Sequence, residues 1–151
     1  MPKLHVESDA HIPATAERVY SIIADYHNGH PHILPKPYFS SLEVEQGGVG
    51  AGTVIHFQMH MLGMTRLLRA EITEPEPGRV LVETYPADGT VTSFIVRPEE
   101  DGKSCHIMIM TDLHVRGGPL GWMQGWAMRT LLHRIYQREL AQLAEFATRP
   151  Q

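Results

Sequence analysis

The sequence of 151 residues has little of several features, and each shortage excludes a class of protein. It contains one cysteine, Cys105, so an internal disulfide framework is excluded and a reducing compartment is indicated. No segment approaches the ~18–20 unbroken apolar residues of a membrane-spanning helix. The stretch from Met1 to Asp9 lacks the apolar core of a signal peptide. We therefore expect a cytoplasmic protein without a membrane span.

Basic residues are also scarce relative to acidic ones. The chain has 13 Lys and Arg residues against 17 Asp and Glu residues, and its formal net charge is −4. This balance favours neither nucleic acid nor an anionic membrane surface as a partner. The 42% apolar and 20% charged residues are typical of a globular protein, so we expect one domain over residues 1–151. Histidine and methionine, by contrast, are abundant, with ten and eight copies.

Proline is missing from most of the last quarter of the chain. From Pro119 to Thr148 no further proline occurs, and the only glycines are Gly121 and Gly125. At ~100° per residue, the apolar residues of this stretch fall on one arc, namely Met128, Leu131, Leu132, Ile135, Tyr136, Leu143 and Phe146. The pattern predicts one long helix whose apolar arc is buried against the rest of the chain.

The chain before this helix alternates with period two, which is typical of half-buried strands. Thr15 is a candidate N-cap for a short helix that ends near Asp25, and a proline-rich segment with a helical turn or ordered loop follows it. The expected strands cover residues 4–10, 39–45, 55–61, 68–72, 80–85, 91–96 and 105–115. Turn signals such as Ala87-Asp88-Gly89 join them as hairpins.

Several short motifs, each weak by itself, recur in one known family. They are Ile12-Pro13-Ala14, Glu17-Arg18-Val19-Tyr20 with Asp25, the Pro35 region, Gly50-Ala51-Gly52-Thr53, Glu74-Pro75 with Arg79-Val80, and Gly117-Gly118-Pro119-Leu120-Gly121-Trp122. With the order of elements, they make the whole chain resemble the START-like (SRPBCC) superfamily, in particular its polyketide cyclase/dehydrase-like members. The resemblance implies an α+β helix-grip fold. In this fold a curved antiparallel sheet of about seven strands surrounds the long C-terminal helix, and two short helices follow the first strand.

The resemblance also implies a cavity between the sheet and the long helix. We expect it to bind a small hydrophobic or aromatic molecule, lipid-like or polyketide-like, without a cofactor. The expected ligand-binding residues are Tyr26, His30, His32, Leu34, Phe57, Met59, Met61, Leu68, Phe94, Met128 and Leu131. Two alternatives remain open: a polyketide cyclase or dehydratase that transfers protons through pocket histidines or glutamates, and an interaction module with a filled core. In the second, Met108 and Met110 on the outer face of the last strand would belong to a homodimer surface.

Three histidines lie close together at His27, His30 and His32, where relatives often carry a tryptophan–proline pair. Imidazole suits zinc, copper and nickel, but the spacing matches structural sites only loosely and no cysteine is near. The other two interpretations are a polar loop and histidines at the pocket mouth. We expect no structural metal, and we expect the segment from Tyr26 to Pro37 to shape the pocket entrance.

The candidates for catalysis are His30, His32 and Glu139, with Tyr136 nearer the edge of the helical arc. Glu139 lies near the centre of this arc, where it either pairs with an arginine, lies in water beyond the core or faces the cavity. At 1.5 Å per residue it is about 16 Å along the helix from Met128. If the cavity opens at the helix N-terminus, Glu139 is too deep to meet the histidines at one substrate atom. The sequence therefore favours binding without turnover.

Overall fold

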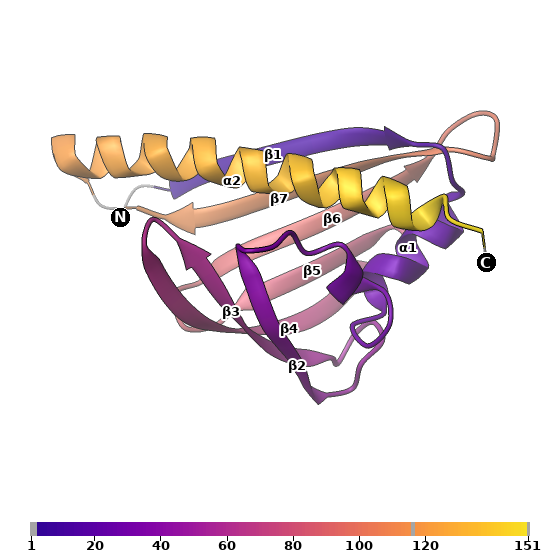
Figure 1. The fold of residues 1–151 in the computed structure, drawn as a ribbon, viewed down its shortest axis with the longest axis horizontal. Helices are drawn as coiled ribbons and strands as arrows, with labels where there is room; N and C mark the ends of the chain where they lie inside the picture. The colour runs from indigo at the N-terminus through magenta and orange to yellow at the C-terminus, as the bar shows by residue number, and fades with distance from the viewer. Residues whose placement is uncertain (1–2, 116, 151) are drawn as a thin grey trace.

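The computed structural model describes residues 3–115 and 117–150, and within them a single antiparallel sheet curves around one long helix (Figure 1). Along the sheet the strands follow the order β1-β7-β6-β5-β4-β3-β2. In chain order the elements are β1 (Lys3–Ile12), α1 (Ala16–Ala24), the 3₁₀ turn η1 (His30–His32), β2 (Phe39–Gln46), β3 (Val54–Met61), β4 (Met64–Glu76), β5 (Val80–Tyr85), β6 (Thr90–Pro98), β7 (Cys105–His114) and α2 (Gly118–Ala147). The expected helix-grip architecture is confirmed, with η1 in place of a second short helix.

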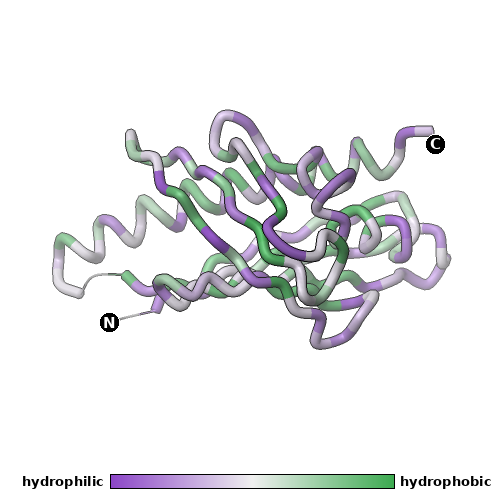
Figure 2. The backbone as a smooth tube through the Cα atoms, turned by 90° about the horizontal axis from the view of Figure 1, so that it is seen from below, coloured by the Kyte–Doolittle hydropathy of each residue, from purple (hydrophilic) through white to green (hydrophobic). Residues whose placement is uncertain are grey.

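The strands form where the sequence alternates, because each has one face toward α2 and the core and one face toward water. In β1 the side chains of Leu4, Val6 and Ser8 are buried while their neighbours are exposed. Figure 2 shows the same alternation of hydrophobic and hydrophilic positions along the strands. The β1–β7 pairing runs without a break from Lys3 opposite His114 to Ile12 opposite Cys105.

The short helix α1 holds the segment that follows it against the core. Thr15 caps it, since its side-chain oxygen accepts a hydrogen bond from the Arg18 amide at 3.1 Å. Beyond the end of α1, the carboxylate of Asp25 accepts hydrogen bonds from the amides of His27 and Asn28, both at 3.0 Å. This turn directs the chain into η1, whose first residue is His30.

The long helix α2 is buried on one side over its second half. Its buried side chains there include Leu132, Ile135, Tyr136, Leu140 and Leu143. Over the first turns only Gly121 and Gly125 are buried, and large apolar side chains are left exposed. Neither helix in the described part of the chain is long and apolar enough to span a membrane.

Candidate functional site

A cavity of about 260 Å³ lies between the concave face of the sheet and α2. Its walls are mostly apolar and come from β3, β4, β6 and α2, with Phe57, Met59, Leu68, Phe94 and Met128 among them. The lining residues at one end are exposed, namely Leu62, Met64, Arg66 and Asp88. Those at the other end are buried and polar, namely His30, Glu83 and Glu139. The cavity therefore has an open, mainly apolar end and a closed, polar end.

Three titratable side chains from three separate elements meet at the closed end. His30 comes from η1, Glu83 from β5 and Glu139 from α2, and each is at most 5% exposed. The Nε2 atom of His30 lies 3.7 Å from Oε2 of Glu83 and 3.9 Å from Oε1 of Glu139. Burial strengthens the electrostatic interaction among such groups, and functional acids and bases are commonly found in buried clusters of this kind.

The imidazole of His30 is held in one orientation. Its Nδ1 lies 2.7 Å from the backbone oxygen of Ile23, which can only accept, so Nδ1 carries a proton. The ring stacks on Tyr26 with 4.4 Å between centroids, and its edge contacts Phe94. In the neutral ring the lone pair therefore lies on Nε2, and it faces the two carboxyl groups.

Glu83 is oriented by two tyrosines. Its Oε2 accepts a hydrogen bond from the Tyr26 hydroxyl at 2.6 Å, and its Oε1 accepts one from the Tyr85 hydroxyl at 3.0 Å. Burial, followed by the charge of Glu83, raises the pKa of both tyrosines well above the usual value. Both therefore remain phenols, and both of their donated hydrogen bonds support a carboxylate at Glu83.

Glu139 differs from Glu83, because the described residues offer its carboxyl group no hydrogen bond. Nε2 of His30 lies 3.9 Å from its Oε1, and its side chain lines the cavity. Burial, followed by the charge of Glu83, raises the pKa of Glu139 well above the usual value. The protonated acid is thereby favoured at a position that faces the cavity.

A second polar group of side chains lines the cavity near this cluster. The hydroxyl groups of Thr111 and Tyr136 are hydrogen-bonded to each other, and Thr92 Oγ1 lies 2.8 Å from Thr111 Oγ1. Burial is the largest cause of the raised pKa of Tyr136, so its phenol stays protonated and is available as a donor. Together the two groups place donors and acceptors at one end of an otherwise apolar space.

The structure brings together most of the residues that the sequence indicated. Eight of the eleven expected ligand-binding residues line the cavity, namely His30, Leu34, Phe57, Met59, Met61, Leu68, Phe94 and Met128. The other three do not line it. Tyr26 lies behind His30, the ring of His32 stacks on Phe146 of α2, and Leu131 is partly buried outside the cavity.

Two expectations about this region are wrong. The segment from Tyr26 to Pro37 does not form the entrance, because its turn η1 packs beside the C-terminal part of α2 and places His30 at the closed end. Glu139 is neither exposed nor paired with an arginine, and it does converge with a histidine. The second expectation is wrong because the first one is. If the histidines lay at the mouth, near the start of α2, the axial distance along α2 would separate them from Glu139.

Sequence reasoning missed Glu83 and Tyr85. The alternation in β5 carries the signal, since Leu81, Glu83 and Tyr85 fall on one face of a strand whose Leu81 is fully buried. In the described part of the chain, no group of three or more His, Cys, Asp or Glu side chains is arranged so that it could hold a metal ion. The cluster at the closed end consists of two carboxyl groups and one imidazole.

Known structures share this fold closely. The chain aligns with the solution structure of the KanY protein at 24% identity and a TM-score of 0.84, over 97% of this chain and 99% of that one. It aligns with the Zhui aromatase/cyclase from Streptomyces sp. R1128 at 17% identity and a TM-score of 0.76, over 97% and 94%. A START superfamily protein from Mycobacterium smegmatis aligns at 14% identity and 0.72, over 95% and 97%. At these identities the likeness shows the fold alone.

Comparison with curated proteins gives no significant match. A family model does match, and it spans residues 3–147, almost the whole chain. The resemblance to START-like proteins is thereby confirmed: the chain belongs to the family described as polyketide cyclase / dehydrase and lipid transport.

Proposed function

We propose that the cavity binds a small, largely apolar molecule and that His30, Glu83 and Glu139 transfer protons to and from its polar group. One observation carries the proposal: three buried titratable groups meet at the closed end of an apolar cavity. Such convergence is typical of acid–base sites. The family description, which names cyclases and dehydrases, agrees with this class of chemistry.

The shape and charge of the cavity restrict the ligand. A volume of about 260 Å³ is just below the ~300–1,000 Å³ typical of ligand pockets and favours a compact aromatic molecule. Among the residues that the structure describes, no lysine or arginine lines the closed end, and Arg66 lies at the open end. A carboxylate or phosphate at the closed end would therefore be unpaired, whereas a carbonyl or hydroxyl group can bond to Glu139 or Tyr136.

Dehydration of a β-hydroxy ketone illustrates the proton balance. Nε2 of His30 takes a proton from the carbon between the two oxygen-bearing carbons, and the released electron pair forms the carbon–carbon double bond. The bond to the hydroxyl oxygen breaks, and this oxygen takes the proton of Glu139 and leaves as water. A proton returned from His30 to Glu139, directly or through that water, restores both groups.

Glu83 has a different role in this scheme. Its two tyrosine hydrogen bonds fix its position, and its charge lies 3.7 Å from the nitrogen that becomes protonated. A carboxylate at this distance stabilises the imidazolium that forms during the reaction. The same charge disfavours ionisation of Glu139, which keeps the acid in its protonated form between turnovers.

Carriage of a ligand without turnover is the second candidate, and it is the function that the sequence alone favours. Its support is the open end, where Leu62, Met64 and other apolar side chains would admit and release an apolar molecule. The two functions differ in what happens to the bound molecule, so one set of variants separates them.

We predict that the protein dehydrates 4-hydroxy-4-phenylbutan-2-one, a compact aromatic β-hydroxy ketone whose conjugated product is followed by its ultraviolet absorbance. His30→Ala and Glu139→Gln should each lower the rate by about 10²–10⁴-fold, because each removes one partner in proton transfer. The dissociation constant of the probe, measured by calorimetry, should change little, because the apolar walls remain.

His32→Ala is the matched control. It removes a histidine from the same 3₁₀ turn, but its ring stacks on Phe146 outside the cavity, so the rate should stay near that of the wild type. Circular dichroism checks that all variants fold. Tight binding of the probe with no turnover above buffer, in wild type and variants alike, would assign the protein to carriage.

A further inference from the structure

Exposed apolar side chains concentrate at one end of the molecule. Among the described residues, eight large apolar side chains are strongly exposed, and seven of them lie in two short segments. The first segment is the β3–β4 hairpin, with Leu62, Met64 and Leu67, and the second is the start of α2, with Leu120, Trp122, Met123 and Trp126. Both segments lie at the same end of the molecule (Figure 1). We call these seven residues the apolar rim.

The apolar rim borders the open end of the cavity. Leu62 and Met64 line the cavity from the hairpin, and Met128 lines it from α2, less than one turn beyond Trp126. The first turns of α2 extend past the end of β1 in Figure 1, so the sheet does not cover them. A contiguous exposed apolar surface beside a cavity opening is a site at which a monomer is expected to meet a partner.

The apolar side chains at the start of α2 point in several directions. Gly121, Gly125, Trp122 and Trp126 line a groove on one flank, together with Leu4 and Val115. Met128 faces the cavity on the other flank, while Met123 is 61% exposed. A flat protein partner covers one face of a helix, whereas a bilayer surrounds an inserted helix end on all sides. The distribution therefore favours a lipid surface over a second copy of this chain.

The charges around the apolar rim have one dominant sign. From Gly117 to Arg138 the sequence has no Asp or Glu, but it has Arg129, Arg134 and Arg138. The hairpin contributes Arg66, whereas Arg69 is paired with Glu45 at 3.2 Å, and the acidic residue that lines the cavity mouth is Asp88. Although the net charge of the chain is −4, this end of the molecule is basic, and both tryptophans lie there. Tryptophan and arginine together are typical of surfaces that enter the headgroup region of a bilayer.

We propose that the apolar rim docks onto an anionic lipid surface and brings the cavity opening against it. Trp122, Met123, Trp126 and the hairpin tip would enter the headgroup region, and Arg129 and Arg66 would contact lipid phosphates. The proposal concerns where an apolar ligand enters and does not depend on what the closed end of the cavity does to it. It also replaces the expectation, drawn from net charge alone, that no anionic membrane surface is a partner.

The chain reports on this surface through its own fluorescence, because Trp122 and Trp126 are its only tryptophans. Vesicles of phosphatidylcholine with phosphatidylglycerol should shift the emission to shorter wavelength, and brominated lipid should quench it. Arg129→Gln should weaken vesicle binding by about fivefold, since one cationic contact with an anionic surface is lost. The Trp122→Ser/Trp126→Ser double variant, followed by co-sedimentation, should bind at least about tenfold more weakly.

Arg97→Gln is the matched control, because it removes an exposed arginine from β6, away from the apolar rim, and should bind as the wild type does. Unchanged emission and no co-sedimentation would overturn the proposal, and so would equal binding to vesicles of phosphatidylcholine alone. A concentration-dependent dimer that buries the tryptophans without lipid would also overturn it and would assign the apolar rim to a second copy of this chain.

Discussion

His30 and His32 show how far two neighbouring residues of one type can differ. Both belong to the same 3₁₀ turn, yet His30 is 1% exposed with its Nε2 toward two carboxyl groups, while His32 stacks on Phe146. A 3₁₀ turn has about three residues per turn, so residues 30 and 32 lie about 120° apart around its axis and their side chains meet different surroundings. At the residue scale, His30 is thus the functional candidate of this histidine-rich stretch, and His32 is a packing residue.

Besides its place in the proposed proton transfer, Glu139 affects how the stability of the fold depends on pH. Its pKa is raised in the folded protein by burial and then by Glu83, so the native state binds its proton more tightly than the unfolded chain does. The group therefore favours folding while it is protonated. Its contribution is lost as the pH rises from the ordinary glutamate pKa of about 4.3 toward the raised pKa.

We predict that Glu139→Gln makes stability less dependent on pH. The amide keeps the shape of the neutral acid but has no proton to lose. The free energy of unfolding of the variant should therefore rise relative to that of the wild type as the pH rises. Each unit by which the folded pKa exceeds the unfolded one corresponds to about 1.4 kcal/mol at high pH. Urea unfolding from mildly acidic to mildly alkaline pH measures the difference.

The matched control is Glu145→Gln, on the same helix. The side chain of Glu145 is 69% exposed and forms only an ion pair with Arg149, so the profile of this variant should run parallel to that of the wild type. Parallel profiles for Glu139→Gln as well would show that Glu139 ionises normally in the folded protein.

At the scale of elements, period-two and helical patterns predicted nearly all of the architecture. The long helix was expected from Pro119 to Thr148 and is found from Gly118 to Ala147. The largest boundary difference is in β4, which begins at Met64 because it pairs with β3 up to the tight turn at Gly63. Residues 64–67 do not alternate apolar with polar, since both of their faces are exposed at the hairpin tip.

Glu83 shows why the site was harder to predict than the fold. Its strand was predicted, and alternation places it on the buried face, but a lone inward glutamate has no meaning until its partners are known. Those partners, His30 and Tyr26, come from a loop whose path the period-two and helical patterns do not determine. Local patterns specify which face a residue occupies, and only the packing of elements specifies what it meets.

Two glycines make the packing of elements testable. A Cβ added to Gly29, between α1 and η1, would overlap the carbonyl oxygen of Ile22, so Gly29→Ala must move the turn that carries His30. A Cβ added to Gly125 of α2 would meet only the methyl carbons of Val115, at 3.9 Å. Alanine exceeds glycine in helix propensity by up to about 1 kcal/mol, so Gly125→Ala should stabilise the protein.

We therefore expect opposite signs from the same chemical change. Gly29→Ala should destabilise the protein by about 1–3 kcal/mol, the range of ordinary steric mutations, and should disturb the His30 site, while Gly125→Ala should raise the free energy of unfolding. Denaturant unfolding of the two variants under one condition measures both effects. A stabilising Gly29→Ala would mean that α1 and η1 are not held as closely as described.

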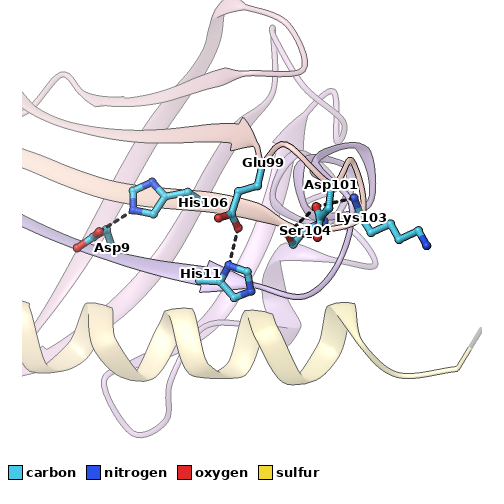
Figure 3. A network of polar contacts seen from close by, with 7 residues as sticks. All are labelled: Asp9, His11, Glu99, Asp101, Lys103, Ser104 and His106. Atoms are coloured by element: carbon cyan, nitrogen blue, oxygen red, sulfur yellow. Dashed lines mark hydrogen bonds and ion pairs between the residues drawn. The ribbon is translucent and has the colours of Figure 1, made fainter.

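At the scale of the whole molecule, the abundant histidines and methionines separate into distinct regions. Met59, Met61, Met64 and Met128 line the cavity, where flexible thioethers suit an irregular apolar ligand. Many of the histidines instead pair with acids on the outer face of the sheet. Figure 3 shows one such region, where His106 Nε2 lies 2.6 Å from Asp9 and His11 Nδ1 lies 2.5 Å from Glu99.

This distribution bears on the expectation, drawn from the loose spacing of His27, His30 and His32, that the protein holds no structural metal. His30 and His32 are directed apart, and on the outer face His5, His56 and His106 each lie beside a carboxylate. Within residues 3–115 and 117–150, no group of three or more His, Cys, Asp or Glu side chains is arranged so that it could hold a metal ion. A closed structural site for zinc needs four such ligands in most proteins.

We predict that a strong chelator leaves the unfolding temperature unchanged. A structural metal contributes its binding free energy to folding, about 10–16 kcal/mol for zinc in small zinc-binding domains, so its removal would lower the unfolding temperature markedly. Here stability comes instead from the sheet, α1 and the second half of α2, whose buried apolar side chains form one continuous cluster. Thermal unfolding with and without chelator, supported by elemental analysis of the purified protein, is the measurement. A large loss of stability together with a stoichiometric metal would reassign the histidines, and His30 with its two glutamates would be the first ligands to test.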